Sequence, residues 1–284
     1  MLIGDNNFNK KTINKVFDYF ENYQILLIAN IGSLEMGTYR YNSDYDIGVL
    51  IKDGADPAFK KFTFENYEIS LINLHWMLNG AFNQSDDFEF ASWNECVQLL
   101  MSTHTYDPYG IQRPLFQCFS LNLDKKAIAK RYLDKVLDLY NFQNYGDCVN
   151  VKRCLTLIYY LLCLNWVMEI GDYPPISIEV LKQIVVQCDI LELINYIQKE
   201  NEKWNREMLQ DTSNITHYSY KLIKLKQKHL SILDHVIQNL KTIYSNINET
   251  TQDIVSIDVA LKLIEAKMNR NIEIQKFTYH PMCE

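Results

Sequence analysis

The sequence predicts an α+β protein: a mixed sheet with flanking helices in its N-terminal part, followed by an α-helical region. Two observations predict this. Short apolar runs typical of buried strands occur only before about residue 75. From about residue 123 onward, every long segment instead repeats its apolar residues at helical spacing. We therefore expect two domains, residues 1–120 with the sheet and residues 121–284 with the helices.

The N-terminal part is predicted to contain one helix and three strands. Apolar residues recur at helical spacing in 9–21. The run YQILLIAN (23–30) predicts a buried strand that Gly32 ends. DIGVLI (46–51) predicts a second strand, closed by the turn residues KDGADP, and FENYEISLIN (64–73) predicts a third. The expected order is therefore helix, strand, turn, strand, strand.

The C-terminal part is predicted to be helical, with THTYDPYGIQRP (103–114) as the connector before it. The periodic segments are 124–140, 150–170, 177–200, 215–247 and 251–269. The most apolar run, CLTLIYYLLCLNWVM (154–168), is shorter than the roughly 20 residues that span a bilayer. We expect a buried helix there and no membrane partner.

Composition narrows the classes of function. The net charge of −7 argues against a protein that binds nucleic acid over most of its surface, because phosphate contacts need clustered Lys and Arg. A local basic cleft is still possible. The seven cysteines show no CxxC spacing, so buried free thiols are favoured over a disulfide framework. Residues 1–20 have the pattern of an amphipathic helix rather than a signal peptide. These features predict a cytoplasmic protein.

Two like charges at the edge of an apolar strand need a physical reason. Asp44 and Asp46 are two residues apart, so their side chains share a face if the chain is extended. Carboxylates held close together repel one another, and burying them unpaired is costly. A divalent cation offsets that cost, and Mg²⁺ prefers such hard oxygen ligands. The pair therefore predicts a site for Mg²⁺ or Mn²⁺.

A third acid on the next strand would complete a two-metal site. Glu65 and Glu68 are the candidates, and their spacing of three places them on opposite faces of a strand. Glu68 lies deeper in the apolar run and is preferred, with Glu65 as the alternative.

The Gly-Ser pair before the aspartates predicts an anion site. Gly32 permits a tight turn close to a ligand, and Ser33 is a natural N-cap for a short helix beginning near Leu34. A helix N-terminus offers free N–H groups to phosphate. A Gly-Ser turn or an SDxD stretch alone is common in solvated loops. The combination, with ten residues between Ser33 and Asp44, is typical of phosphoryl or nucleotidyl transfer.

The stretch GSLEMGTYRYNSDYDIGVLI resembles the signature of the DNA polymerase β-type nucleotidyltransferase superfamily. More narrowly, the chain resembles the RNA-ligase-associated (RlaP-type) predicted nucleotidyltransferases over roughly residues 20–190. Three features carry this narrower resemblance: Gly37 together with the SDYD ending, the strand, helix and acidic segment of 69–93, and the basic helix with Trp166 that leads to a Pro-Pro loop in 152–181.

The resemblance implies transfer of a nucleoside monophosphate from an NTP, such as ATP, to a hydroxyl. The implied acceptor is RNA, in RNA or tRNA repair or end modification. By this resemblance Asp44 and Asp46 bind both metals. Glu68 binds the metal next to the acceptor hydroxyl and helps to remove its proton.

The resemblance also implies a set of nucleotide-binding residues. Gly32 and Ser33 would hold the phosphates, and Arg40 would neutralise the triphosphate from the turn. From the residues alone, a solvated turn arginine is an equal interpretation of Arg40. Lys152 and Arg153, at the start of the Trp166 helix, are further candidates for the triphosphate.

The acceptor is the part of the function that the residues leave open. Lys221, Lys224 and Lys228 share a helical face and would guide RNA, although a solvated face is the default for such a pattern. Glu89 matches an acid of the family. The alternatives are an enzyme that modifies a protein or small molecule, as an AMP-adding antitoxin or an aminoglycoside-type enzyme does, and an inactive nucleotide-binding module. The preferred NTP and the oligomeric state also stay open.

Overall fold

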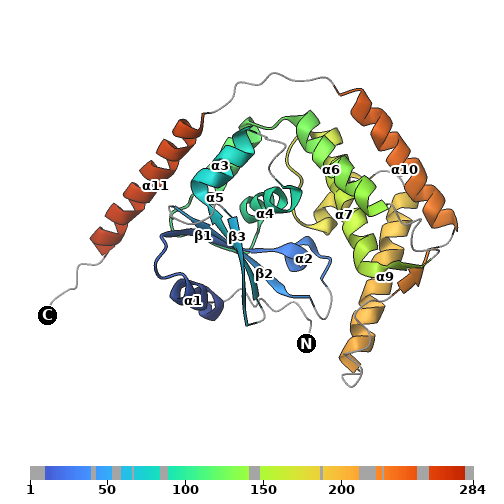
Figure 1. Ribbon diagram of the computed structural model, residues 1–284, viewed down its shortest axis with the longest axis horizontal. Coiled ribbons are helices and arrows are strands. Elements are labelled where there is room, and N and C mark those ends of the chain that lie inside the picture. The colour runs from blue at the N-terminus through green and yellow to red at the C-terminus, as the bar shows by residue number, and fades with distance from the viewer. Residues whose placement is uncertain are drawn as a thin grey trace. The chain divides into compact units, whose positions relative to one another are not determined.

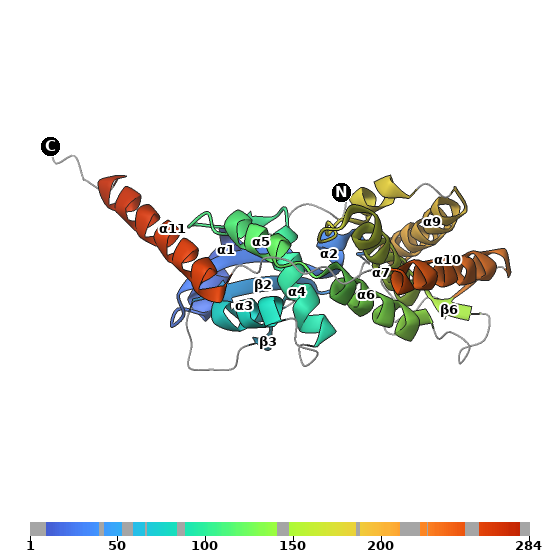
Figure 2. The same ribbon diagram turned by 90° about the horizontal axis from the view of Figure 1, so that it is seen from above.

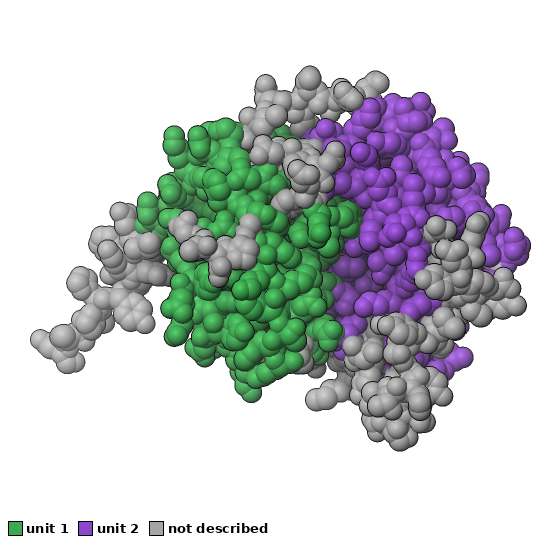
Figure 3. Space-filling model, viewed as in Figure 1, with its two compact units in different colours: residues 1–32, 44–122, 252–284 green, residues 33–43, 123–251 purple. Residues whose placement is uncertain are grey.

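The structure is a computed structural model with the expected α+β architecture, a five-stranded mixed sheet with flanking helices and a helical region (Figure 1). The described residues are 10–39, 43–52, 59–65, 67–83, 89–140, 148–185, 188–210, 222–225, 227–247 and 256–278. The chain divides into two compact units (Figure 3). Unit 1 consists of 1–32, 44–122 and 252–284, and unit 2 of 33–43 and 123–251.

Unit 1 contains the sheet, with the strand order β3-β4-β2-β1-β5. The strands are Ile25–Ile31 (β1), Tyr45–Ile51 (β2), Phe59–Phe64 (β3), Tyr67–Asn73 (β4) and Thr105–Tyr106 (β5). β2 and β4 run parallel, whereas all other neighbours are antiparallel. The apolar run of β1 is buried over its whole length, as its sequence predicts for a strand inside a sheet.

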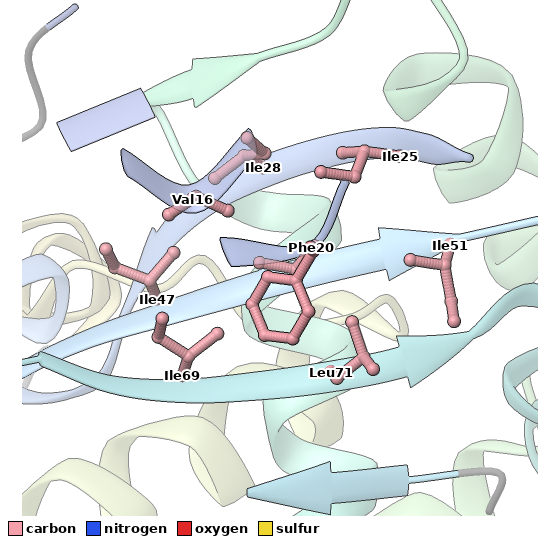
Figure 4. Packing of buried hydrophobic residues seen from close by; sticks show 9 residues of the cluster. Val16, Phe20, Ile25, Ile28, Ile47, Ile51, Ile69 and Leu71 are labelled. Atoms are coloured by element: carbon pink, nitrogen blue, oxygen red, sulfur yellow. The ribbon is translucent and has the colours of Figure 1, made fainter. Parts of the chain in front are cut away.

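One face of the sheet packs against α1 (Lys10–Tyr19). Val16 and Phe20 meet Ile47 from β2 and Ile69 and Leu71 from β4 in this core (Figure 4). Because side chains alternate along a strand, the intervening residues of β2 and β4 project to the opposite face. Those residues include Asp46 of β2 and Glu68 of β4.

The opposite face packs against α4 (Phe90–Met101), while α3 (Leu74–Asn83) follows β4 directly (Figure 2). A Cβ atom on Gly48 of β2 would lie 2.7 Å from Cδ1 of Leu99, so α4 approaches the strand as closely as glycine allows. Two further helices, α5 (Gln112–Leu121) and α11 (Ile257–Thr278), belong to this unit, and α11 contacts α5 and α3.

Unit 2 is built around α7, one of its long helices. Its elements are α6 (Lys125–Tyr140), β6 (Cys148–Asn150), α7 (Val151–Ile170), α8 (Ile178–Leu181), the 3₁₀ helix η2 (Lys182–Ile184), α9 (Cys188–Gln210), β7 (Leu222–Lys224) and α10 (Gln227–Ser245). By length and composition α7 could cross a membrane, but 67% of its most apolar window is buried inside the protein. It packs against α6, α9 and α10, as a core helix does.

The third predicted strand is wrong in its boundaries. The run 64–73 is divided by a turn at Glu65, which has a φ of 54°, and β4 begins only at Tyr67. The residues before the turn form β3, a strand the sequence analysis did not predict. β3 lies at the edge of the sheet, where one side chain in two faces solvent, so its lysines conceal the apolar pattern.

The connector and the strand content after residue 123 also differ from the expectation. Residues 103–114 are part of unit 1, because β5 pairs with β1 and α5 begins at Gln112. The region after residue 123 does contain strands, since β6 and β7 form a small antiparallel sheet. The units differ from the expected domains in two segments: 33–43 groups with the helices of unit 2, and 252–284 groups with the sheet.

Candidate functional site

Asp46 and Glu68 lie side by side at the start of two parallel strands. They are Cα partners in the register of β2 with β4. Paired residues of parallel strands project to the same face, and this face is the one opposite α1. Both acids are half-buried, while Asp44 lies one residue before β2 and is exposed. Two acids that are distant in sequence are therefore neighbours at one end of the sheet, and Asp44 lies two residues before Asp46.

Glu65 is placed differently. It lies in the turn between β3 and β4, and its Oε2 is 2.6 Å from Nζ of Lys15 on α1. Lys15 belongs to the helix on the other face of the sheet. Of the two glutamates considered, Glu68 is therefore the one beside Asp46.

Gly32 contacts this acid end from the neighbouring strand. It follows β1 directly and has a φ of 73°, a conformation that favours glycine. A Cβ atom on Gly32 would overlap Oδ2 of Asp46 and lie 2.5 Å from its Cγ. The Gly32 N–H donates to Oε1 of the buried Gln98 on α4, at 2.7 Å. The turn is thus held by α4 while the Asp46 carboxylate fills the space beside its α-carbon.

A lysine from the edge strand reaches the same face. Nζ of Lys61 lies 2.5 Å from Oε1 of Glu68 and 2.8 Å from Oε1 of Glu95 on α4. Lys61 is the register partner of Ser70, two residues after Glu68, which explains why it shares the face. Partial burial by itself lowers the pKa of Lys61, but the hydrogen bonds and charges of the two glutamates outweigh it and raise that pKa above 10.5. Lys61 is therefore a permanent cation.

The sequence analysis missed Lys61, Glu95 and Gln98. The alternation in KFTF (61–64) is the signal that could have found the strand carrying Lys61. Glu95 and Gln98 are three residues apart in a mostly apolar helix, so they share a face that is expected to be buried. A polar pair on such a face is a reason to look for polar partners on the sheet.

Ser33 is not the N-cap that the sequence predicted. The helix α2 (Gly32–Met36) includes Ser33 as its second residue. The left-handed conformation of Gly32 completes the turn within one residue, so the helix follows the strand without a separate cap. The backbone N–H of Thr38 donates to the Ser33 carbonyl at 2.9 Å and closes this short helix. Arg40 lies outside the described residues.

Lys152 and Arg153 begin α7 in unit 2, where the structure gives them local roles. The side chain of Asn150 caps the helix by accepting from the Lys152 N–H at 2.8 Å. Arg153 donates from Nε to the Leu139 carbonyl at 3.1 Å and from Nη2 to the Asp138 carbonyl at 3.2 Å. Arg153 therefore satisfies the last carbonyls of α6, whereas the Lys152 side chain is exposed.

The remaining sequence candidates are described only in part. Lys228 forms an exposed ion pair with Glu192, with Nζ 2.8 Å from Oε2. Lys221 and the side chain of Lys224 lie outside the described residues. Glu89 is exposed and precedes α4, and its side chain forms no capping hydrogen bond.

The described cysteines are not part of the site. Cys96, Cys118, Cys154 and Cys163 are buried and free, as expected. Burial raises the pKa of the Cys154 thiol to about 12, although the charge of Arg153 acts against the shift. These thiols therefore stay protonated and are poor nucleophiles and poor metal ligands.

The acids fit a metal ion by their chemistry. Carboxylate oxygens are the ligands that Mg²⁺ and Mn²⁺ prefer. Across the described ranges, no three or more His, Cys, Asp or Glu side chains are already gathered so that they could hold a metal ion. Glu68 is bound to Lys61 instead. The donor set fits a hard divalent cation, and Asp44, Asp46 and Glu68 are the residues that could hold it.

No family model and no curated protein matches the sequence. Among solved structures, the chain is similar to a nucleotidyltransferase-like protein from Exiguobacterium sibiricum, at 14% sequence identity. The similarity covers 93% of this chain and 89% of that chain, with a TM-score of 0.26. A TM-score of this size does not establish a shared fold.

Proposed function

We propose that the chain is a metal-dependent nucleotidyltransferase that transfers a nucleoside monophosphate from an NTP to a hydroxyl. The observation that carries the proposal is the pairing of Asp46 with Glu68 in register on parallel strands. Gly32, which follows β1 directly, lies against the Asp46 carboxylate, so the end of β1 also lies beside these acids. The proposal assigns phosphate binding to this turn and metal binding to the acids beside it, the two functions that nucleotidyl transfer requires.

In the proposed reaction, the acceptor oxygen attacks the α-phosphorus of the NTP. A new P–O bond forms, the bond to the β-phosphate oxygen breaks, and pyrophosphate leaves. When bound, Mg²⁺ neutralises the phosphate charge and lowers the pKa of the attacking hydroxyl. Asp44, Asp46 and Glu68 would hold Mg²⁺, and Glu68 would also help to remove the proton of the attacking hydroxyl. Ser33, directly after Gly32, would donate a hydrogen bond to the phosphates.

The finer proposal is that the acceptor hydroxyl belongs to RNA. It is supported by the resemblance to the RNA-ligase-associated nucleotidyltransferases. The prediction that the three lysines share one helical face is wrong, because Lys224 ends the strand β7 whereas Lys228 lies in α10. Lys228 is also paired with Glu192. The RNA acceptor therefore depends on the resemblance more than on surface charge.

The test uses the purified chain, each NTP labelled in turn at the α- or γ-phosphate, Mg²⁺ or Mn²⁺, and total cellular RNA. The proposal expects α-label in RNA, no γ-label, and no transfer by the Asp44→Asn/Asp46→Asn variant. Transfer of γ-label, or transfer that survives the double substitution, would overturn the proposed function. Metal-dependent α-label on protein or on a small molecule would overturn only the RNA acceptor.

A further inference from the structure

Lys61 forms an ion pair with Glu68, the acid that the proposed function needs for catalysis. Its ammonium lies between two carboxylates, 2.5 Å from Glu68 and 2.8 Å from Glu95. The three side chains come from β3, β4 and α4 and meet on the face that carries Asp46. A divalent cation bound by Asp46 and Glu68 would therefore meet a resident positive charge.

The two glutamates differ in how they hold Lys61. The Glu68 side chain is 38% exposed, whereas that of Glu95 is 15% exposed. Oε2 of Glu95 is buried and has no hydrogen-bond partner in the part of the chain that the structure describes. A buried carboxylate oxygen without a partner is costly and calls for an explanation. Glu95 thus has an acceptor ready for a second hydrogen bond from the Lys61 ammonium.

We infer that Lys61 competes with the divalent metal for Glu68 and that Glu95 receives the ammonium when the metal binds. This inference rests on the proposed function. Lys61 and Glu95 are positioning residues that act through Glu68. They affect the metal in opposite directions: Lys61 repels it and blocks Glu68, while Glu95 attracts it and draws Lys61 away.

The prediction for Lys61 follows from its charge. Lys61→Met keeps a long apolar stem and removes the ammonium, so Glu68 becomes free to bind the metal. We expect Mn²⁺ affinity to rise by about tenfold or more, the scale of removing a unit charge a few ångströms from a divalent ion in a water-like dielectric. Lys60→Met is the matched control: it makes the same charge change one residue earlier, where the ammonium lies over the Phe62 ring. It should change Mn²⁺ affinity much less.

Glu95→Gln should act in the other direction. Without the Glu95 carboxylate, Lys61 keeps Glu68 as its carboxylate partner and competes more strongly with the metal. Mn²⁺ affinity should fall. In Lys61→Met/Glu68→Gln the gain of Lys61→Met should disappear, because the ligand that Lys61 blocks is gone.

The experiment measures free Mn²⁺ by electron paramagnetic resonance, without NTP, in the presence of the parent chain or one of these variants. Circular dichroism confirms that each variant folds. Lys61→Gln serves if Lys61→Met does not fold. Equal Mn²⁺ affinity in Lys61→Met, Lys60→Met and the parent would overturn the inference. If Asp44→Asn/Asp46→Asn nevertheless loses Mn²⁺ binding, the proposed function stays intact. Equal binding, or none, in the parent and that double variant would overturn both.

Discussion

The carboxylate of Asp46 lies against the α-carbon of Gly32, so closely that a Cβ atom at residue 32 would overlap its Oδ2. The two residues are separated in sequence but adjacent in space, because Ile31 and Asp46 are partners in the antiparallel register of β1 with β2. The Gly-Ser and Asp-x-Asp motifs therefore contact each other through Gly32 and Asp46. Glycine is required at residue 32 both by its φ of 73° and by this carboxylate.

Gly32→Ala should destabilise the fold and displace Asp46. Left-handed backbone costs a non-glycine residue about 1–2 kcal/mol, and the overlap with Asp46 adds to that cost. Gly110→Ala is the matched control, since Gly110 has a φ of 65° and nothing within 4 Å of its Cβ position. Urea unfolding should show a larger loss for Gly32→Ala than for Gly110→Ala, and only Gly32→Ala should weaken Mn²⁺ binding. Equal losses of stability would mean that Asp46 moves aside without cost.

Asp44→Asn/Asp46→Asn should leave the metal-free protein at least as stable as the parent, because it removes the repulsion between two carboxylates. It should lose the stabilisation that excess Mg²⁺ gives, which follows RT ln(1 + [L]/Kd). Nucleotidyl transfer should fall by at least about 10³-fold, because the variant lacks the acids that we propose as metal ligands. Thermal melts with and without Mg²⁺ check this. If the variant is less stable than the parent and Mg²⁺ changes the Tm of neither protein, the aspartates have a structural role.

Ser33→Ala should weaken NTP binding by about 1.5–3 kcal/mol, the range for a hydrogen bond to a charged group. The fold should survive, because the backbone carbonyl of Ser33, and not its hydroxyl, accepts from Thr38. Equilibrium binding of a fluorescent NTP analogue measures the effect. An affinity equal to that of the parent would remove Ser33 from the phosphate site.

Arg153→Met should reduce stability by about 1–3 kcal/mol, because the carbonyls of Leu139 and Asp138 lose a charged donor. Lys152→Met, the neighbouring control, should change stability little, since the Lys152 side chain is exposed. Urea unfolding and NTP affinity are measured on both variants. If Arg153→Met weakens NTP binding while its stability equals that of the parent, the nucleotide-binding role expected from the sequence is right and the structural role is wrong.

Local patterns were sufficient for several elements. The segments 124–140 and 150–170 were predicted as helices, and α6 and α7 match each within one residue at either end. The strand carrying Asp46 was also predicted from the sequence, because a short apolar run closed by turn residues depends only on neighbours in the chain. The strand β3 was missed, since an edge strand has no continuous apolar signal.

The sequence by itself determined which residue types are available at the acid end of the sheet: a glycine at the turn and carboxylates at spacings that alternate along a strand. Only the tertiary structure decided that Glu68, and not Glu65, stands beside Asp46, because that choice depends on the register between β2 and β4. It also decided that Lys61 meets Glu95, a residue on a helix that packs against β2 near Gly48. Strand register and helix packing minimise the free energy of the whole buried core, and no local pattern contains those long-range contacts.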